Sequence, residues 1–347
     1  MEKQEARTCE NLKSRFTKLA FVPIDAGFHM ENKWVWCGSS VEEAGKGYHL
    51  YASCWRKDYP MLEGYVLFSE IVHAFSEKMT GPYDFVEKIL QSGNPADWNG
   101  CMAHNPAIVK WKDKYLLYYI ASTYTDEPTP PEIIQKQRSL VDKIYSQIRI
   151  GVAIADAPGG PWHFCKDPIL EARPGYWDAA LVTNPAPCVL PDGKIYLYYR
   201  SNAPEGLRIG LAVAEHPEGP YVRLQSDPIM QDICIEDPFV WHNGECFEML
   251  AKDMKGTLTG EFHAGAQFLS RDGINWHLKG KAYSRTITYE NGKIFTLGSL
   301  ERPQLLFGMD GNPKCLFAAA ADGPGGFQKA KNTWNIAIPF SETSNSK

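Results

Sequence analysis

The stretch Glu236-Asp237-Pro238-Phe239-Val240-Trp241 places a polar pair and a proline directly before a run of strand-forming apolar residues. Three other stretches begin in the same way, and a short turn and a second apolar run follow each of them. These are His104-Asn105-Pro106-Ala107-Ile108-Val109, Thr183-Asn184-Pro185-Ala186-Pro187-Cys188 and Glu301-Arg302-Pro303-Gln304-Leu305-Leu306. A unit that recurs in this form indicates a repeat architecture, in which each copy folds into the same group of strands.

A second motif recurs later in these units, where a strand is followed by glycine, proline and an aromatic residue. Copies span residues 71–83, 150–162 and 209–221, and a degenerate copy spans residues 266–276. With a further unit beginning near Trp36-Cys37-Gly38-Ser39, the polar entrances number five. About four strands per unit at this spacing predicts an all-β fold, a five-bladed β-propeller with four-stranded antiparallel blades. A large β-sandwich is the alternative, but it does not explain the repeated entrances.

The repeat also predicts how the chain is divided. We expect residues 21–340 to form one propeller domain, with residues 1–20 as an N-terminal arm and residues 341–347 as a C-terminal tail. The last unit is short of a strand, so residues 19–24 are expected to complete it and close the ring. One segment departs from the strand pattern, because its apolar residues predict a helical insertion around residues 131–148.

Composition and charge argue against several classes of protein. Hydrophobic residues make up 44% and charged residues 22% of the 347 residues, which allows a large core and argues against disorder. The net charge of -5 with no basic cluster argues against a nucleic-acid partner. No apolar run reaches the length of a membrane span and no signal peptide is visible, so no membrane partner and a cytoplasmic location are expected. The nine cysteines lack the spacing of a disulfide framework or a zinc site, and the sequence leaves the oligomeric state open.

The polar entrances are predicted to meet in one place, because the innermost strand of every propeller blade begins beside the central axis. Their acidic members are Glu236, Asp237 and Glu301, and Asp178 and Asp25 lie just before two other units. Neighbouring carboxylates drive each other's pKa values apart, which leaves one as a proton donor and another ionised. Glycosidic bond cleavage needs this combination, so these residues are the candidate catalytic groups. A structural role as a turn cap or an ion-pair partner is the alternative for each of them.

Polar and aromatic side chains near the same entrances are the candidate substrate-binding residues. Amide and cationic groups suit sugar hydroxyls and carboxylates, and tryptophan rings stack on sugar faces, although tryptophan is more often a core residue. The candidates are His104, Asn105, Asn184, Arg200, Lys252, Arg302, Trp36 and Trp177. This chemistry requires no cofactor, and no ligand motif calls for a metal ion, although the propeller axis would allow one.

The repeated entrance and the glycine-proline-aromatic turn resemble those of the five-bladed propeller glycoside hydrolases. These are family 43 and its relatives, the arabinanase, β-xylosidase and α-L-arabinofuranosidase group, and the resemblance covers roughly residues 21–340. It implies a glycosidase that cleaves an oligosaccharide or glycoside by carboxylate acid/base catalysis in the central funnel. In that group an Asp at the first blade is the base, an Asp at the third blade tunes pKa values, and a Glu opening a later blade is the acid.

This chain departs from the family pattern at its first three entrances. Gly38-Ser39 opens the first unit, and Asn105 and Asn184 occupy the next two, so only the last two entrances keep acids. The chain therefore resembles a divergent member of the group. Its catalytic base is expected to come from another position, such as Asp25 or Asp178.

Two other functions stay open on the same fold. A carbohydrate-binding propeller without catalysis fits the missing acid at the first blade. A sugar lyase or phosphorylase would instead draw on the basic residues near the entrances. These are His104, Arg200, Lys252 and Arg302.

Overall fold

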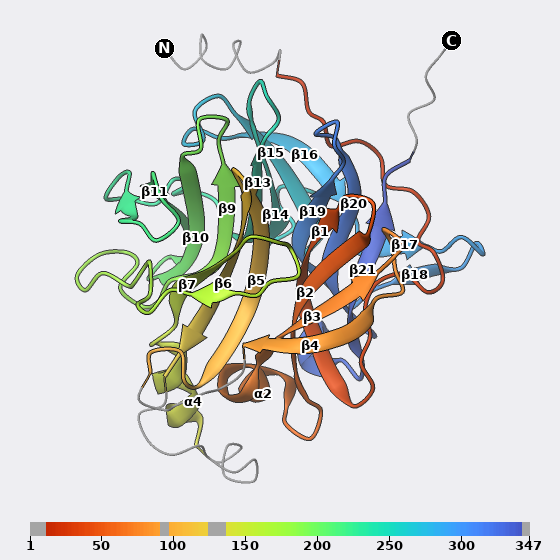
Figure 1. Ribbon diagram of the computed structural model, residues 1–347, viewed down its shortest axis with the longest axis horizontal. Coiled ribbons are helices and arrows are strands. Elements are labelled where there is room, and N and C mark those ends of the chain that lie inside the picture. Colours follow the sequence, from red (N-terminus) through yellow and green to blue (C-terminus); the bar gives the residue numbers. More distant parts are fainter. Residues whose placement is uncertain (1–11, 91–96, 124–136, 342–347) are drawn as a thin grey trace.

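The computed structural model describes residues 12–90, 97–123 and 137–341, and within them the chain forms a five-bladed β-propeller (Figure 1). Every blade is an antiparallel sheet whose strands follow one another in chain order. The first strands of adjacent blades contact each other around the axis. Four blades have four strands, and the fifth has three of its own. The fold predicted from the repeated entrances is therefore confirmed.

Within each blade the first strand lies at the axis and the later strands lie progressively further out. Blade 1 contains β1 (Lys33–Glu43), β2 (Gly47–Arg56), β3 (Glu70–Ser76) and β4 (Asp84–Leu90). Blade 2 contains β5 (Met102–Trp111), β6 (Lys114–Ser122), β7 (Arg149–Ala155) and β8 (His163–Phe164). Blade 3 contains β9 (Thr183–Val189), β10 (Ile195–Ala203), β11 (Gly206–Ala214) and β12 (Val222–Arg223). Blade 4 contains β13 (Ile235–His242), β14 (Phe247–Asp253), β15 (Gly265–Ser270) and β16 (His277–Tyr283). Blade 5 contains β19 (Ser299–Phe307), β20 (Pro313–Ala321) and β21 (Thr333–Pro339).

Each polar entrance is a β-bulge in the innermost strand of its blade. The pairing with the second strand shifts register there, for example between His104 and Ala107 and between Glu236 and Phe239. One non-glycine residue at every bulge has a positive φ, between 53° and 57°; these residues are Cys37, Asn105, Asn184, Asp237 and Arg302. Proline suits the next position because a bulge interrupts the ladder, so its missing N–H is not needed for pairing. The repeated motif in the sequence therefore marks the bulge.

The N-terminal segment closes the ring by lying along the outer strand of blade 5. Leu19 forms an antiparallel bridge to Phe340, and Phe28 forms another to Asn335 of β21. Between them, Val22 pairs with Tyr289, which directly follows β17 (Thr286–Thr288) of a small hairpin with β18 (Ile294–Thr296). The expected closure by residues 19–24 is present as isolated bridges, and it extends to Phe28.

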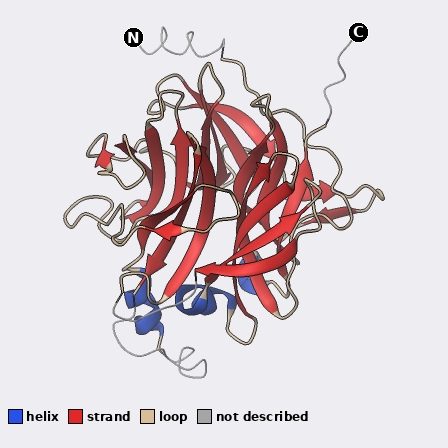
Figure 2. Cartoon of the chain, in the orientation of Figure 1, coloured by secondary structure: helices blue, strands red, loops and turns tan. Residues whose placement is uncertain are grey.

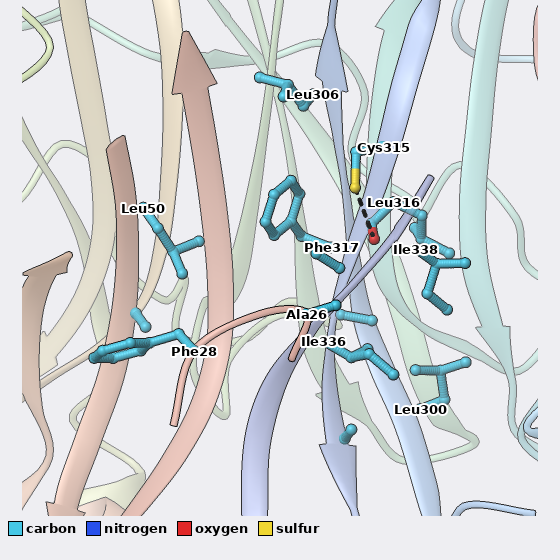
Figure 3. Packing of buried hydrophobic residues seen from close by; sticks show 14 of the residues in the cluster. Ala26, Phe28, Leu50, Leu300, Leu306, Cys315, Leu316, Phe317, Ile336 and Ile338 are labelled. Atoms are coloured by element: carbon cyan, nitrogen blue, oxygen red, sulfur yellow. Dashed lines mark hydrogen bonds between the residues drawn. The ribbon is translucent and has the colours of Figure 1, made fainter. Parts of the chain in front are cut away.

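The hydrophobic core lies between neighbouring blades. Figure 3 shows part of the cluster in which Phe28 and Leu50 of β2 pack near Phe317 of β20 and Ile338 of β21. Phe28 and Phe317 are 1% and 0% exposed. Full burial of a side chain of this size stabilises a fold by roughly 1.5–3 kcal/mol. This packing joins the first and last blades and so holds the ring closed around the axis.

Two helices lie together at one end of the propeller (Figure 2). Helix α4 (Arg138–Tyr145) falls within the helical insertion predicted around residues 131–148, of which residues 131–136 lie outside the described part. Helix α2 (Met61–Phe68) follows β2 and contacts both α4 and the short 3₁₀ helix η1 (Phe327–Lys329). No helix in the described ranges is long and apolar enough to cross a membrane.

The described part of the N-terminal arm, residues 12–20, docks on blade 4 before it reaches blade 5. Ser14 Oγ donates a 2.6 Å hydrogen bond to Glu248, which is 0% exposed, and accepts one of 2.6 Å from Gln267. The Ser14→Ala substitution should therefore lower the free energy of unfolding by about 2 kcal/mol, since hydrogen bonds to charged groups exceed neutral ones. Urea denaturation measures this. The exposed Ser146→Ala is the control, and an equal effect of both substitutions would argue that docking of the arm contributes no stability.

Candidate active site

The bulges meet around a cavity of about 500 Å³ at the helical end of the propeller, which we call the axial pocket. Asn105, Asn184, Asp237 and Arg302 line it from the bulges of four blades. Helices α2 and α4 and Phe327 of η1 cover it from the other side. Further lining residues are Trp36, Trp55, Met61, Leu62, Tyr65, Val66, His104, Arg138, Val141, Asp142, Tyr145, Arg200, Asn202, Glu236 and Glu301.

Hydrogen bonds join the five bulge residues, and we call this set the axial ring. The Cys37 thiol donates to Asn105 Oδ1 at 2.8 Å, and Asn105 Nδ2 donates to Asn184 Oδ1 at 3.4 Å. Asn184 Nδ2 in turn donates to Asp237 Oδ1. Arg302 donates to Asp237 from the other side. Its Nη1 lies 3.4 Å from Oδ1 of Asp237, and its backbone N–H donates to Oδ2 at 3.2 Å. Each ring residue is at most 5% exposed, so Asp237 is held by partners on both sides.

Three carboxylates from blades 4 and 5 form a tight group beside this ring. Glu236, Asp237 and Glu301 each offer an oxygen, and these oxygens lie within 4.8 Å of one another. Lys252 of β14, 2% exposed, bridges two of them, with its Nζ 2.8 Å from Glu236 and 2.9 Å from Glu301. Arg200 of β10 lies 3.4 Å from Glu236. The negative charges are therefore compensated from within the fold.

Burial and charge drive the pKa values of the two adjacent carboxyls in opposite directions. Burial would raise the pKa of Glu236, but the positive charges of Lys252 and Arg200 outweigh it and lower the pKa to about 2. Burial, followed by the negative charge of Glu236, raises the pKa of Asp237 above its usual value despite Arg302. Glu236 is therefore an anion at neutral pH, and Asp237 holds a proton more readily than an exposed aspartate.

The same three carboxylates are the group in the described chain that could hold a metal ion. Carboxylate oxygens suit hard cations such as Ca²⁺ and Mg²⁺. Lys252, however, already sits between Glu236 and Glu301 at hydrogen-bond distance. A metal ion would have to displace this ammonium group, so the donor set fits an ion pair better than a metal centre.

His104 of β5 lies in the pocket wall as a neutral imidazole. Ser69, the residue after α2, lies 2.7 Å from its Nδ1, and the Cys37 sulfur lies 3.7 Å from its Nε2. Burial, assisted by the charge of Arg302, lowers the pKa of His104 well below its usual value. The ring of Tyr65 packs against it at 4.3 Å between centroids. His104 therefore contributes a polar but uncharged surface to the pocket.

Three residues predicted from the sequence do not come to the pocket. Asp178 is fully buried, and Arg173, Tyr199 and Arg223 each donate to it at 2.8 Å. Its oxygens therefore bind side chains of blade 3 and of the segment before it. Trp177 stacks on Tyr199 with centroids 5.9 Å apart. Asp25 is exposed in a turn of the N-terminal segment. Lys252 contacts two pocket carboxylates but lies behind the wall, and the other nine predicted residues line the pocket.

The helical cover contributes site residues that the sequence did not indicate. Tyr145 of α4 accepts a 3.1 Å hydrogen bond from Arg200, which ties the cover to the pocket wall. Asp142 and Arg138 of the same helix pair with each other at the rim. Tyr65 of α2 lies over His104. The helical insertion expected from the sequence indicated α4, but it did not indicate which end of the propeller this helix covers.

The chain is similar in structure to several solved glycoside hydrolases. It superposes on Zg3597, a family 117 glycoside hydrolase produced by the marine bacterium Zobellia galactanivorans, with a TM-score of 0.69 and 19% identity over 94% of this chain and 91% of that one. The chain shares the propeller glycoside hydrolase fold. It also matches an α-L-arabinofuranosidase from Lactobacillus brevis (TM-score 0.56, 12% identity, 93% and 94% coverage) and a GH43_1 enzyme from Xanthomonas citri (0.55, 14%, 95% and 94%).

These likenesses establish the fold, and the low identities fit a divergent member of the group that the sequence resembles. No protein-family model and no curated protein matches the sequence. A shared fold does not define an activity, which depends on the residues of the axial pocket.

Proposed function

We propose that this protein is a glycoside hydrolase that cleaves a glycosidic bond of an oligosaccharide in the axial pocket. The observation that carries the proposal is the carboxylate group of Glu236, Asp237 and Glu301 in a covered pocket, with pKa values driven apart. Asp237, whose pKa is raised, is the proton donor to the leaving oxygen. Glu301, whose Oε1 has no hydrogen-bond partner among the described residues, is the group that attacks or activates water.

The rest of the wall suits a sugar. Asn105, Asn184 and His104 line the pocket as uncharged polar groups, so they do not compete for the proton of Asp237. Trp36 is 7% exposed and also lines the pocket, where its indole can face a sugar ring. A cavity of about 500 Å³ covered by helices fits the end of an oligosaccharide better than the middle of a long chain.

The spacing of the carboxylates predicts that the anomeric configuration is retained. Their nearest oxygens lie within 4.8 Å of one another. Retaining enzymes separate the two carboxyl groups by about 5–5.5 Å, and inverting enzymes by about 6.5–9.5 Å to make room for water. Proton NMR of the first product formed should therefore show the configuration of the substrate. Inversion would contradict this pairing and would point to a more distant carboxylate, such as Asp142 on α4.

The raised pKa of Asp237 predicts the alkaline side of the pH profile. A general acid works only while protonated, so kcat/KM should fall as pH rises through the pKa of Asp237. Glu236→Gln removes a neighbouring negative charge that raises this pKa, so the fall should move to lower pH in that variant. The Asp25→Asn control, outside the pocket, should leave the profile in place. An unmoved profile in Glu236→Gln would contradict the role of Asp237.

The test of the proposal is a screen of aryl glycosides and of plant and algal oligosaccharides, with the products separated by chromatography. We expect release of a sugar with a new reducing end in plain buffer. Turnover only with added phosphate would indicate a phosphorylase, and an unsaturated product absorbing in the ultraviolet would indicate a lyase. Either result would overturn hydrolysis as the reaction.

One observation favours a second candidate, a carbohydrate-binding propeller without catalysis. The axial ring has neutral residues in the first three blades, Cys37, Asn105 and Asn184, so no carboxylate faces the acidic group from those bulges. Binding of an oligosaccharide in calorimetry together with no product from the same ligand after prolonged incubation would favour this candidate.

A further inference from the structure

Among the fully buried polar atoms of the residues that line the axial pocket in the described chain, more donors than acceptors lack a hydrogen-bond partner. Among the described lining residues, Arg302 has two guanidinium nitrogens, Nε and Nη2, without a hydrogen-bond partner, and Trp55 Nε1 is in the same state. Arg200 Nε contacts Glu236 only as an ion pair at 3.4 Å. The one fully buried acceptor without a partner among the described lining residues is Glu301 Oε1.

These donors are deeply buried, so the lack of a hydrogen-bond partner is costly for them. Arg302 is 4% and Trp55 1% exposed, so bulk water is a poor substitute for a partner. A buried donor without a partner costs about 1–3 kcal/mol, and more when the group is charged. A wall that carries such donors at a pocket is complementary to a ligand that brings acceptors.

The charges around the pocket also favour a ligand that brings acceptors. Three buried cations surround the carboxylate group: Arg200, Lys252 and Arg302. Glu236 and Glu301 balance two of them, and Asp237 balances the third only when it is ionised. When Asp237 carries the proton that acid catalysis requires, one positive charge is left over at the wall.

We propose that the sugar bound in this pocket is anionic, a uronate or a sulfated sugar, whose acidic oxygens accept hydrogen bonds from Nε and Nη2 of Arg302. The inference rests on the proposed function, because it assigns a substrate class to the same pocket. The guanidinium fork matches carboxylate and sulfate oxygens in bidentate geometry. A neutral sugar would bring hydroxyl donors as well, whereas Glu301 Oε1 is the one fully buried acceptor of the described lining residues that lacks a partner.

Matched ligands test the charge without changing the protein. Calorimetry would compare galacturonic and glucuronic acid with their methyl esters and with galactose and glucose, and galactose 6-sulfate would distinguish sulfate from carboxylate recognition. We expect at least one acid or sulfate to bind about tenfold or more tightly than its uncharged counterpart, which corresponds to about 1.4 kcal/mol. Equal binding of acid and ester, binding of neutral sugars only, or no binding of any anionic sugar would overturn the inference.

A variant series tests the residue. Arg302→Lys keeps the charge but loses the fork, and it should remove most of the preference for the anion while binding of the neutral counterpart changes little. The control is Arg56→Gln, which removes an exposed arginine paired with Asp58 outside the pocket. Trp55→Phe gives a second readout, because it removes one donor and should weaken anion binding without touching the Arg302–Asp237 pair. An unchanged preference in both Arg302→Lys and Trp55→Phe would contradict the assignment.

The outcomes also separate this inference from the proposed function. Hydrolysis of neutral glycosides that stops in Asp237→Asn, with no binding of uronates, would leave the glycosidase standing and remove the anionic substrate. Tight binding of a uronate that is never hydrolysed in any linkage would support recognition of an anionic sugar and contradict the glycosidase.

Discussion

Asp237→Asn and Glu301→Gln are each expected to lower kcat/KM by about 100-fold to 10,000-fold on whichever glycoside the screen identifies, the range that general acid or base catalysis supplies. Asn184 donates to one oxygen of Asp237 and the Arg302 backbone N–H to the other, so asparagine keeps the size of the side chain and one of these two acceptors, but it cannot donate the proton that the leaving oxygen needs. Gln at position 301 can still accept from Lys252 but cannot attack or activate water.

The matched control for these variants is Asp25→Asn, an exposed carboxylate outside the pocket, for which we expect kcat/KM within about twofold of the wild type. Thermal unfolding of all variants shows whether a loss of rate reflects a loss of folded protein. Unchanged rates in both pocket variants would place the chemistry elsewhere in the chain.

Lys252→Met is expected to destabilise the fold by about 3–5 kcal/mol, because it leaves two carboxylates without their shared buried counterion. The ammonium group lies 2.8 Å from Glu236 and 2.9 Å from Glu301. Its own pKa is raised above the usual value, since the two glutamates outweigh the effect of burial. Chemical denaturation measures the loss directly.

The pH dependence of this loss follows from Glu236. Its folded-state pKa of about 2 is below the unfolded value, so it contributes stability above pH 4.5 that is lost as pH falls toward 2. Without Lys252 the pKa of Glu236 should rise, so the deficit of the variant should be largest near neutral pH and shrink in acid. The control is Lys281→Met, which breaks an exposed pair with Glu261 and should change stability by about 1 kcal/mol or less. Equal effects of the two substitutions would show that the buried bridge contributes no more than a surface pair.

The fold could be predicted from the sequence because its signal is local and repeated. A bulge needs a residue that tolerates positive φ and a following residue that gives no ladder hydrogen bond, and Asn105-Pro106 and Asn184-Pro185 supply both. The same local rule brought Glu236, Asp237 and Glu301 together, since each lies at or beside a bulge.

The residues that the sequence misplaced or missed depend on tertiary contacts. The position of Asp178 before an entrance predicted a pocket residue, but a hydrogen bond from Arg223, 45 residues away, holds its side chain outside the pocket. Cys37 takes its place in the axial ring by backbone geometry alone, because Gly38 stands where the other units have proline. Helix α2, with an apolar sequence and Pro60 before it, carries no strong helical period. Its place over the pocket follows from packing against β2, β5 and α4.

Trapping the reacting group tests whether carboxylates of the axial pocket cleave the glycosidic bond. An activated 2-deoxy-2-fluoroglycoside of the sugar found in the screen would be incubated with the protein, followed by intact mass and peptide mapping. We expect one added glycosyl group on Glu301 of β19, and none in Glu301→Gln. A label on a residue outside the pocket would contradict the site, and steady hydrolysis of natural substrate with no label formed would contradict the covalent, retaining route through Glu301.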